Sequence, residues 1–421
     1  MRSLTVRSCL GLVLAGALAS GMLAAGPADA TAATSHWRVT VISPPANPAS
    51  ALTAVACPTS TWCAAAGWDG SQAPEAGPSS NFTLAESHGK WSSPKTLVLP
   101  SDAEVAAGAN VNDIACTGNG SCVAVGVYVV SGASEPAFIA IEQHGTWQRA
   151  FRPSLPRNAA TPADSVLSAV TCTGLGSCEA VGGYYLKNGE FLPMSVTESG
   201  GRWRRAAGIE LPPHVTSAGL ESIACAHAGS CVAVGSYSTA GDASYVAAAT
   251  LQVRGRWRRV APLKLPASER PNSQLNSVSC NPSGQCFAVG TSFAASASAR
   301  SMMATLSRGR WSNVKLLRRV PSGAPRGTGV TLRAVSCART FCLAAGGYTL
   351  RNGKSEWIVI RIQGDAWSTA TEIGVPAGNP GTLALALAVS AASCSRSGAC
   401  AVVGSFQNES ADAQALAAIS G

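Results

Sequence analysis

One segment recurs seven times along this chain and limits its possible folds more than any other feature. The copy at Leu167–Gly182 reads Leu-Ser-Ala-Val-Thr-Cys-Thr-Gly-Leu-Gly-Ser-Cys-Glu-Ala-Val-Gly. Every copy has an apolar run, a cysteine, a short polar turn, a second cysteine, and then Ala-Val-Gly or a close variant. The other copies are Leu52–Gly67, Val111–Gly126, Leu220–Gly235, Leu275–Gly290, Leu332–Gly346 and Val389–Gly404. Such periodicity is typical of folds in which each repeat is one structural unit.

The cysteines follow the repeat. The chain has 15, and all except Cys9 fall into local pairs. The pairs are Cys57/Cys63, Cys116/Cys122, Cys172/Cys178, Cys225/Cys231, Cys280/Cys286, Cys337/Cys342 and Cys394/Cys400. An even number of locally paired cysteines behind an export signal predicts disulfides formed in an oxidising compartment. A metal site would need Cys-x-x-Cys knuckles or a repeated histidine, and a redox pair would need Cys-x-x-Cys at a helix start; neither pattern is present.

The N-terminus has the features of a secretory signal peptide. Arg2 and Arg7 precede an apolar stretch, and Ala28-Asp29-Ala30 is a small-x-small cleavage site. We therefore predict a signal peptide over residues 1–30, with cleavage after Ala33 as the alternative. A membrane anchor is the competing interpretation, but the stretch is short and rich in alanine and glycine. The prediction is a secreted, extracellular protein, either free or associated with the cell wall, with no transmembrane segment in the mature chain.

A tryptophan recurs with the same period as the cysteine pairs. The first cysteines of successive pairs are 53 to 59 residues apart, and a tryptophan follows each of the first six by 30 to 34 residues. These tryptophans, each after a glycine-containing turn, are Trp91, Trp147, Trp203, Trp257, Trp311 and Trp367. Each repeat is therefore predicted to form four short strands. Leu220–Cys225 is an example of the first strand, and the second strand begins at the second cysteine of the repeat. Ala137–Gln143 is an example of the third strand, and the fourth strand carries the tryptophan.

Four strands per repeat predict an all-β fold, a seven-bladed β-propeller with four-stranded blades. A flat solenoid is the alternative. The last repeat stops before its tryptophan strand, whereas Ser35–Ile42 is a tryptophan strand with no repeat before it. We expect residues 31–421 to form one propeller in which residues 36–43 complete the last blade, so that the N-terminal strand closes the ring and removes exposed sheet edges.

Two resemblances support this fold. Gly145-Thr-Trp147 resembles the Asp-box turn of sialidase-like propellers, Ser-x-Asp-x-Gly-x-Thr-Trp, although the aspartate is missing here and Asp365 follows its glycine. Gly120–Gly126, Gly176–Gly182 and Gly229–Gly235 resemble the Ser-Cys-x-Ala-Val-Gly units of uncharacterised secreted repeat proteins of actinobacteria. These resemblances imply a propeller fold and export, and they bring no catalytic residues.

The sequence shows no recognisable set of catalytic residues. A sialidase-type site needs an arginine trio, a Tyr/Glu nucleophile pair and an Asp acid, and a glycosidase needs two facing carboxylates. Neither can be assembled, and the five histidines lie in turns and connections, without a Ser-His-Asp arrangement. The carboxylates considered, none of them in a repeated or paired position, are Asp69, Asp113, Glu179, Glu190 and Glu221. We predict no catalytic residue, no metal and no cofactor.

Two features are candidates for binding. An aromatic residue ends the second strand of six repeats, next to variable loops: Trp68, Tyr128, Tyr184, Tyr237, Tyr348 and Phe406. These rings could stack on sugars or anchor a protein, or they could pack between blades. Arginines also surround the tryptophans of the third to fifth repeats: Arg202, Arg204, Arg205, Arg254, Arg256, Arg258, Arg259, Arg308 and Arg310, with Arg318 and Arg319 beyond. They could attract an anionic polymer, or they could serve as solubilising charge on edge strands.

We therefore predict a monomeric, non-catalytic binding scaffold that acts at or outside the cell envelope. Its expected partner is a glycan, an anionic envelope polymer or an extracellular protein. Nucleic acid is not expected, because a formal charge of +9 comes without a recognisable nucleic-acid module. The alternatives are a carbohydrate-active hydrolase or lyase of the sialidase-like propeller type, and a purely structural envelope component.

Overall fold

The computed structural model shows an all-β protein. It describes residues 37–43, 49–70, 80–104, 108–132, 134–162, 164–239, 242–266, 272–293, 299–317, 330–349, 355–364, 366–374, 388–407 and 413–420. Within these ranges every regular element is a strand, and no helix is long and apolar enough to span a membrane. The chain divides into Met1–Ser35 and His36–Gly421, and every described residue belongs to the second part. The predicted signal peptide lies outside the described residues.

The described strands form seven antiparallel units of the same design, here numbered 1 to 7 in the order of their first strands. The first strands are β2 (Ser50–Thr59), β7 (Ala109–Gly118), β11 (Ser165–Gly174), β16 (Val215–His227), β21 (Asn272–Cys280), β26 (Val330–Cys337) and β31 (Ala388–Cys394). The second strands are β3 (Trp62–Asp69), β8 (Ser121–Tyr128), β12 (Ser177–Tyr185), β17 (Ser230–Thr239), β22 (Cys286–Phe293), β27 (Cys342–Thr349) and β32 (Cys400–Gln407). The third strands are β4 (Ser80–Ser87), β9 (Ala137–Gln143), β13 (Phe191–Ser199), β18 (Asp242–Val253), β23 (Ala299–Ser307), β28 (Ser355–Gln363) and β33 (Ala413–Ser420).

The fourth strands are short and carry the tryptophans. They are β5 (Lys90–Trp91), β10 (Thr146–Trp147), β14 (Arg202–Trp203), β19 (Arg256–Trp257), β24 (Arg310–Trp311) and β29 (Ala366–Trp367). Short strands that also pair with the third strand follow in five units: β6 (Lys95–Thr96), β15 (Ala207–Gly208), β20 (Ala261–Pro262), β25 (Lys315–Leu316) and β30 (Thr371–Ile373). Units 3 and 4 share one sheet through a single parallel pairing, Phe191 with Ser217.

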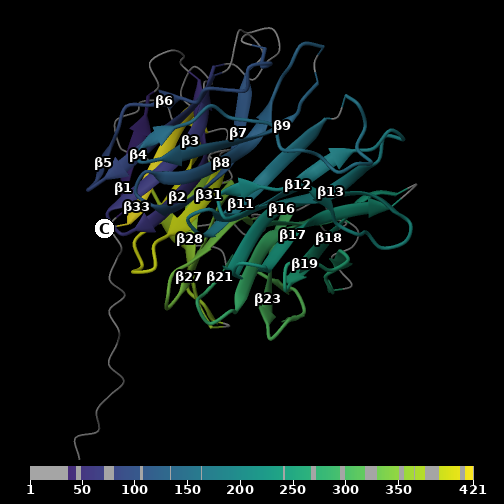
Figure 1. Cartoon of the computed structure of the whole chain (residues 1–421). Coiled ribbons are helices and arrows are strands. Elements are labelled where there is room, and N and C mark those ends of the chain that lie inside the picture. Colours follow the sequence, from purple (N-terminus) through teal and green to yellow (C-terminus); the bar gives the residue numbers. More distant parts are fainter. Residues whose placement is uncertain are drawn as a thin grey trace, which may run out of the picture. The chain divides into compact units, whose positions relative to one another are not determined.

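Unit 7 takes its fourth strand from the other end of the chain. Strand β1 (Trp37–Ile42) pairs antiparallel with β33, with Trp37 opposite Ser420 and Ile42 opposite Ala415. In Figure 1 the purple N-terminal strands accordingly lie beside the yellow C-terminal strands. Trp37 thus fills the position that the tryptophan strand holds in the other units, as the split repeat predicts.

Each unit carries one disulfide, which joins its first strand to its second at the turn between them. The seven bonds are Cys57–Cys63, Cys116–Cys122, Cys172–Cys178, Cys225–Cys231, Cys280–Cys286, Cys337–Cys342 and Cys394–Cys400, the pairs expected from the sequence. Most paired cysteines lie directly opposite each other, as Cys172 and Cys178 do, with Cα atoms 4.0 Å apart. A covalent bond therefore holds the same hairpin in every unit.

The turn between the cysteines meets the turn before the tryptophan. The Gly201 N–H donates to the Gly176 carbonyl oxygen over 3.1 Å. A side chain at Gly176 would lie 2.7 Å from the Gly201 nitrogen, and the φ angle of Gly176 is 65°. The close approach of the two turns and the left-handed backbone therefore both require glycine at this position.

A second close backbone contact explains why the Ala-Val-Gly signature ends in glycine. Each first strand carries a β-bulge opposite this part of the second strand, such as the one between Leu167 and Ala169. A Cβ atom on Gly182 would clash with the carbonyl oxygen of Val166. The equivalent glycines of the other six copies meet the same obstacle. Every copy of the repeat therefore contains a backbone contact that no larger residue allows.

The hydrophobic core consists of seven clusters, each between two units that follow one another around the fold. In one of them, Ala169 and Val181 of unit 3 pack against Leu220 and Trp257 of unit 4. Another cluster joins Leu52 of unit 1 to residues of unit 7. Because both faces of each unit are apolar, a unit is buried only between two neighbours.

The first strands also contact one another in sequence, and β31 contacts β2. A side-chain hydrogen bond recurs between them. The Cys337 N–H donates to Ser279 Oγ over 3.0 Å, the Cys394 N–H donates to Ser336 Oγ over 2.8 Å, and the Cys57 N–H donates to Ser393 Oγ over 2.9 Å. The bond between Cys57 and Ser393 joins the first unit to the last with the geometry of the ordinary junctions.

We expect the disulfides to stabilise the fold through the unfolded chain. A closed loop of this length is worth roughly 2 kcal/mol in a chain-entropy treatment. Reduction of all seven should lower the melting temperature by many degrees, measured by calorimetry with mass spectrometry to verify complete reduction. An unchanged melting temperature in fully reduced protein would contradict this role.

The junction between units 7 and 1 should contribute as much as an internal one. Replacement of Ser393 by alanine removes the bond to the Cys57 N–H and should lower the free energy of unfolding by about 1 kcal/mol. Ser279→Ala is the matched control, because it removes the same bond between units 5 and 6. In urea denaturation the two variants should lose equal amounts of stability. If Ser393→Ala left the free energy of unfolding unchanged while Ser279→Ala lowered it, the contact between the first and last units would not stabilise the fold.

Candidate functional site

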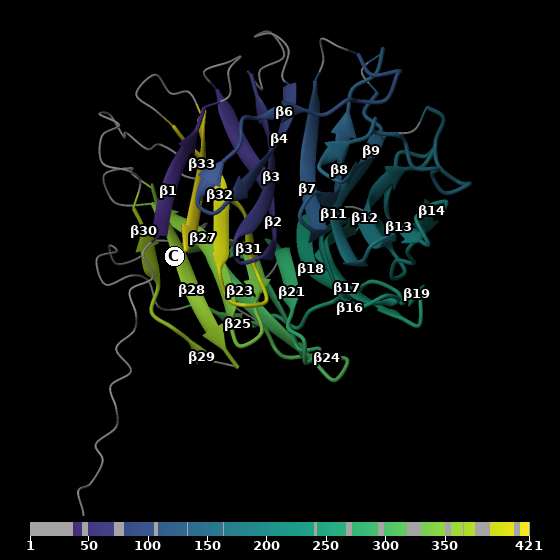
Figure 2. The same ribbon diagram turned by 60° about the vertical axis from the view of Figure 1, so that its left-hand side comes forward.

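The units present two different faces. The disulfide turns and the turns before the tryptophans lie together, as the hydrogen bond from the Gly145 N–H to the Gly120 carbonyl oxygen shows, and we call this the turn face. The opposite ends of the strands carry the longer connections, and we call this the loop face. The first strands lie next to one another, and the tryptophan strands lie at the outer edges of the sheets. Figure 2 shows β14, β19 and β24 at such outer edges, along one side of the fold.

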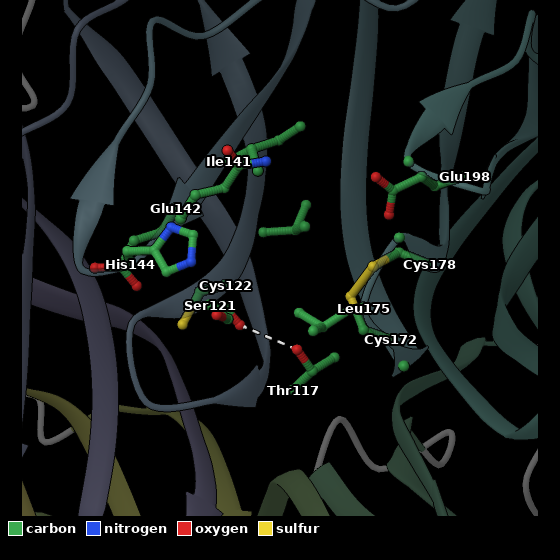
Figure 3. Close-up of a pocket in the computed structure, with 15 residues that line it drawn as sticks. Thr117, Ser121, Cys122, Ile141, Glu142, His144, Cys172, Leu175, Cys178 and Glu198 are labelled. Carbon is green, nitrogen blue, oxygen red and sulfur yellow. Dashed lines mark hydrogen bonds between the residues drawn. A yellow bond between two sulfur atoms is a disulfide. The ribbon is translucent and has the colours of Figure 1, made fainter.

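A cavity of about 430 Å³ opens between units 2 and 3 on the turn face. Glu142 of β9 and the neighbouring His144 lie on one side, and Glu198 of β13 lies on the other (Figure 3). Two disulfides and Leu175, which is 80% exposed, complete much of the wall. Acidic groups thus face an apolar hollow from two successive units.

The two glutamates have the same electrostatic character. Burial raises the pKa of the Glu142 carboxyl, an effect that nearby Lys95 partly offsets, and burial also raises the pKa of Glu198. Hydrolysis by two carboxylates requires one protonated acid and one ionised base, hence environments that separate their pKa values. Burial raises both pKa values, and Lys95 opposes that rise for Glu142 alone.

A second cavity, of about 310 Å³, lies among the first strands. Glu221 of β16, Asn276 of β21 and Arg333 of β26 line it, together with Gln274 and the beginning of β31. Protein around the Glu221 carboxyl raises its pKa by desolvation. This cavity therefore presents an acid and a base from units 4 and 6. No group of three possible metal-ligating side chains occurs anywhere in the described part of the chain.

The cysteines belong to the interior rather than to a ligand-binding surface. Cys63 and Cys231, each of which the sequence predicts to be a disulfide partner, are both buried, at 5% and 6% exposure. Cys63 lies in the core cluster between units 7 and 1, and Cys231 lies in the cluster between units 3 and 4. Their sulfur atoms are bonded to Cys57 and Cys225. The disulfide pairing predicted for these two cysteines is therefore confirmed, and both stabilise the fold from its interior.

The same conclusion holds for other cysteines, with one exception. Further buried members of the set are Cys57, Cys286, Cys342, Cys394 and Cys400. The exception is in position, because Cys122, Cys172 and Cys178 line the cavity on the turn face, although Cys122 and Cys178 are buried as well. Even there the sulfur atoms are bonded to one another within their units and offer only apolar wall.

The carboxylates singled out in the sequence do not come together. Glu179 is buried between units 3 and 4, where it accepts hydrogen bonds from Trp257 Nε1 over 3.2 Å and Gln252 Nε2 over 3.3 Å. Asp113 lies between units 2 and 3, and Asp69 is buried and accepts a hydrogen bond from Ser80. Glu190 follows a turn on the loop face, and Glu221 lines the second cavity. Several of these groups hold neighbouring strands together.

The structure corrects the ligand-binding hypothesis for most of the aromatic residues that end the second strands. Tyr128, Tyr184, Tyr348 and Phe406 are buried in the clusters between units, so their rings cannot stack on a ligand. The hydroxyls of the three tyrosines are hydrogen-bonded as well: Tyr184 Oη, for example, donates to Asn158 Oδ1 over 3.0 Å. Trp68 and Tyr237 are half-buried. Burial of the four rings favours the alternative, packing between units.

Other aromatic side chains reach solvent on the loop face. Tyr185, Tyr245 and Phe293 are 42%, 54% and 44% exposed, and they come from units 3, 4 and 5. Tyr185 follows a buried tyrosine directly, and strand alternation places neighbouring side chains on opposite faces. Alternation therefore predicts that the rings of Tyr184 and Tyr185 lie on opposite faces of β12, and the structure shows that Tyr185 is the exposed one.

The arginines that the sequence singled out lie on exposed surface, on or beside the outermost strands. We call the nine residues the arginine rim, and all of them are exposed: Arg202, Arg204, Arg205, Arg254, Arg256, Arg258, Arg259, Arg308 and Arg310. Only Arg259 forms an ion pair with a described residue, Glu210, at 3.4 Å. Arg205 donates to the Leu155 carbonyl oxygen over 2.7 Å. Arg318 and Arg319 lie outside the described residues.

Comparison with known proteins bears on the fold. No protein-family model and no curated protein matches this chain. A polysaccharide lyase of a new family, an ulvan lyase, has a TM-score of 0.52 and 8% identity over 90% of this chain and 95% of that chain. The lyase bound to -[GlcA(1-4)Rha3S]- has a TM-score of 0.51 and 8% identity over 89% of this chain and 92% of that chain. A Hadza microbial sialidase has a TM-score of 0.46 and 9% identity over 78% of this chain and 66% of that chain. At these identities the likeness to the lyase shows a propeller-type all-β fold alone.

Asp113 makes stability depend on pH. Its carboxylate accepts the N–H groups of Ile114 and Val170, each over 2.8 Å, yet burial raises its pKa from 3.8 to about 7. The folded protein therefore holds this proton more tightly than the unfolded chain does. The stabilising contribution of Asp113 is present in full below about pH 4 and is lost as the pH rises through about 7.

Asp113→Ser tests this dependence, because Ser222 of unit 4 and Ser277 of unit 5 accept the equivalent N–H groups, those of Val278 and Val335 in the next units. Between pH 4 and pH 7, wild-type stability should fall relative to the serine variant by at most about 1.4 kcal/mol per pH unit. Urea denaturation at several pH values measures the difference. Ser222→Ala, a control without a titrating group, should have a constant effect. A difference between wild type and Asp113→Ser that stays flat over this range would refute the raised pKa.

Proposed function

We propose that this protein is a secreted, non-catalytic binding scaffold whose arginine rim holds an anionic polymer of the cell envelope. The observation that carries the proposal is the arginine rim itself. Arg202, Arg256 and Arg310 precede the tryptophans of β14, β19 and β24, so successive units present the same cation at the same position. A regular row of cations matches the repeated charges of a polymer better than the single charge of a small anion.

We also propose that the units are blades of a seven-bladed propeller closed by the N-terminal strand. Three observations support closure. Each core cluster lies between successive units, including one between units 7 and 1. The hydrogen bond between Cys57 and Ser393 repeats the internal junctions, and β1 completes the sheet of β33. A closed ring fixes the outer strands rigidly, which keeps the rim cations in register with one another.

The electrostatics of the rim favour attraction of a polyanion over internal pairing. Arg259 pairs with Glu210, while the other eight arginines form no salt bridge with a described residue. Lys264 and Lys315 add exposed cations beside units 4 and 5. Water and dissolved salt screen exposed charges, so each arginine contributes little to the binding free energy. Binding of a polyanion therefore depends on several arginines acting together. Binding of this kind weakens steeply as salt concentration rises.

The second candidate is a carbohydrate-active enzyme, and the observation that favours it is the pair Glu142 and Glu198 on one cavity. We rank it below binding because this pair occurs in one cavity, whereas the rim repeats the same cation in three successive units. An enzyme of this type would release new reducing ends from envelope glycans and would lose that activity in Glu198→Gln. The absence of any release by the wild-type protein would remove this candidate.

The proposal is tested by co-sedimentation of the mature protein with cell-wall and membrane fractions at low and high salt. The rim variant Arg202→Gln/Arg256→Gln/Arg310→Gln should bind about tenfold more weakly, since three exposed charge contacts together contribute about 1.4 kcal/mol or more. The matched control is Arg157→Gln/Lys187→Gln/Arg339→Gln, which removes three exposed cations away from the rim. It should bind like wild type.

Three results would contradict the proposal. Equal weakening in both variants would assign binding to net charge rather than to the rim. Salt-resistant binding would direct attention to the loop face, with Tyr185, Tyr245 and Phe293. The absence of wild-type binding to either fraction would argue against an envelope scaffold altogether.

A further inference from the structure

The bulge in each first strand supplies one special residue per unit. It lies between two paired residues of the strand and has no partner of its own across the ladder. The seven bulge residues are Thr53, Asn112, Ser168, Glu221, Asn276, Arg333 and Ser390. Four of them, from units 4 to 7, line the cavity among the first strands, so the bulges direct side chains into this space.

Three bulge residues hold neighbouring units together through side-chain hydrogen bonds. Thr53 Oγ1 donates to the Val111 carbonyl oxygen over 2.5 Å, Asn112 Nδ2 donates to the Leu167 carbonyl oxygen over 2.9 Å, and Asn276 Nδ2 donates to the Leu332 carbonyl oxygen over 2.9 Å. Each of these bonds reaches the first strand of the next unit. Short polar side chains are sufficient for this task, and they need no charge.

Glu221 and Arg333 depart from that pattern. They are the charged members of the set, and they come from units 4 and 6 on either side of unit 5. Both line the same cavity of about 310 Å³, and both are exposed to it. The ion pairs formed by described residues do not include either of them. Opposite charges thus share a confined space without neutralising each other.

We propose that this cavity binds a small zwitterion, with the ligand's ammonium group at Glu221 and its carboxylate at Arg333. A guanidinium holds a carboxylate through parallel charge-assisted hydrogen bonds, and a carboxylate accepts from an ammonium group. A zwitterion neutralises both protein charges at once, whereas a simple anion or cation leaves one of them unpaired. A cavity of this size has room for one amino-acid-sized molecule.

The other polar groups fit a supporting role. Gln274 Nε2 donates to Asn276 Oδ1 over 2.9 Å, and Asn276 also bonds to the next unit. Their amides are therefore engaged with each other and with the backbone, which favours recognition through the two charges. A neutral sugar would have to compete for amides that are already bonded. Desolvation, which raises the pKa of Glu221, is relieved when an ammonium group pairs with its carboxylate.

The test uses ω-amino acids that differ only in the distance between their charges: glycine, β-alanine, 4-aminobutanoate and 6-aminohexanoate. Isothermal titration calorimetry on the mature protein should show one length that binds best, because the two protein charges are fixed in separate units. Butanoate and butylammonium are one-ended controls and should bind at least about tenfold more weakly than the best zwitterion. Equal binding by a one-ended probe would overturn the proposal, as would no binding by any member of the series.

Variants of the two charges give a second test. Glu221→Gln and Arg333→Gln should each weaken binding of the best zwitterion by about tenfold or more, while Ser168→Ala, a bulge variant outside the cavity, should not. The exchanged pair Glu221→Arg/Arg333→Glu should recover binding, because a zwitterion fits in the reverse direction. Thermal melts verify that each variant is folded. Unchanged binding in both glutamine variants would overturn the assignment of these residues.

Discussion

Every unit of this protein has two apolar faces and cannot bury both by itself. A four-stranded antiparallel sheet of this size gains stability only when neighbours cover it, and here each core cluster is shared between two units. Alanine and valine dominate the second strands, so the sheets approach closely, and each tryptophan on a fourth strand extends the contact at the outer edge. Strand β1 serves the same requirement in unit 7, where Trp37 packs against the cluster shared with unit 6.

A scaffold built in this way separates stability from recognition. Contacts between units use the interior faces of the strands, whereas the turns, the connections and the outer edges are free to carry other side chains. The arginine rim lies at the outer edges and the acidic cavity lies on the turn face, whereas the bulges of the first strands line the charged cavity. Because these places lie on a shared rigid frame, charges from different units hold fixed positions relative to one another, as recognition of an extended or two-ended ligand requires.

The buried carboxyl groups follow a single electrostatic rule. Asp113, Glu142, Glu179, Glu198 and Glu221 all have pKa values raised mainly by desolvation. Glu142 and Glu198 share the cavity on the turn face, whereas the other three lie at separate places in the fold.

The sequence alone determined the repeat, the seven cysteine pairs, the strand pattern and the exchange of Trp37 into the last unit, because each depends on local spacing and strand alternation. It also indicated the exposed arginine rim, since charged residues beside a tryptophan edge strand have few ways to be buried. Only the tertiary structure showed that Tyr128 and Tyr184 are interior and Tyr185 is exposed. It alone brought Glu221 and Arg333 into one cavity, because residues more than a hundred positions apart meet only when the bulges of separate units face the same space.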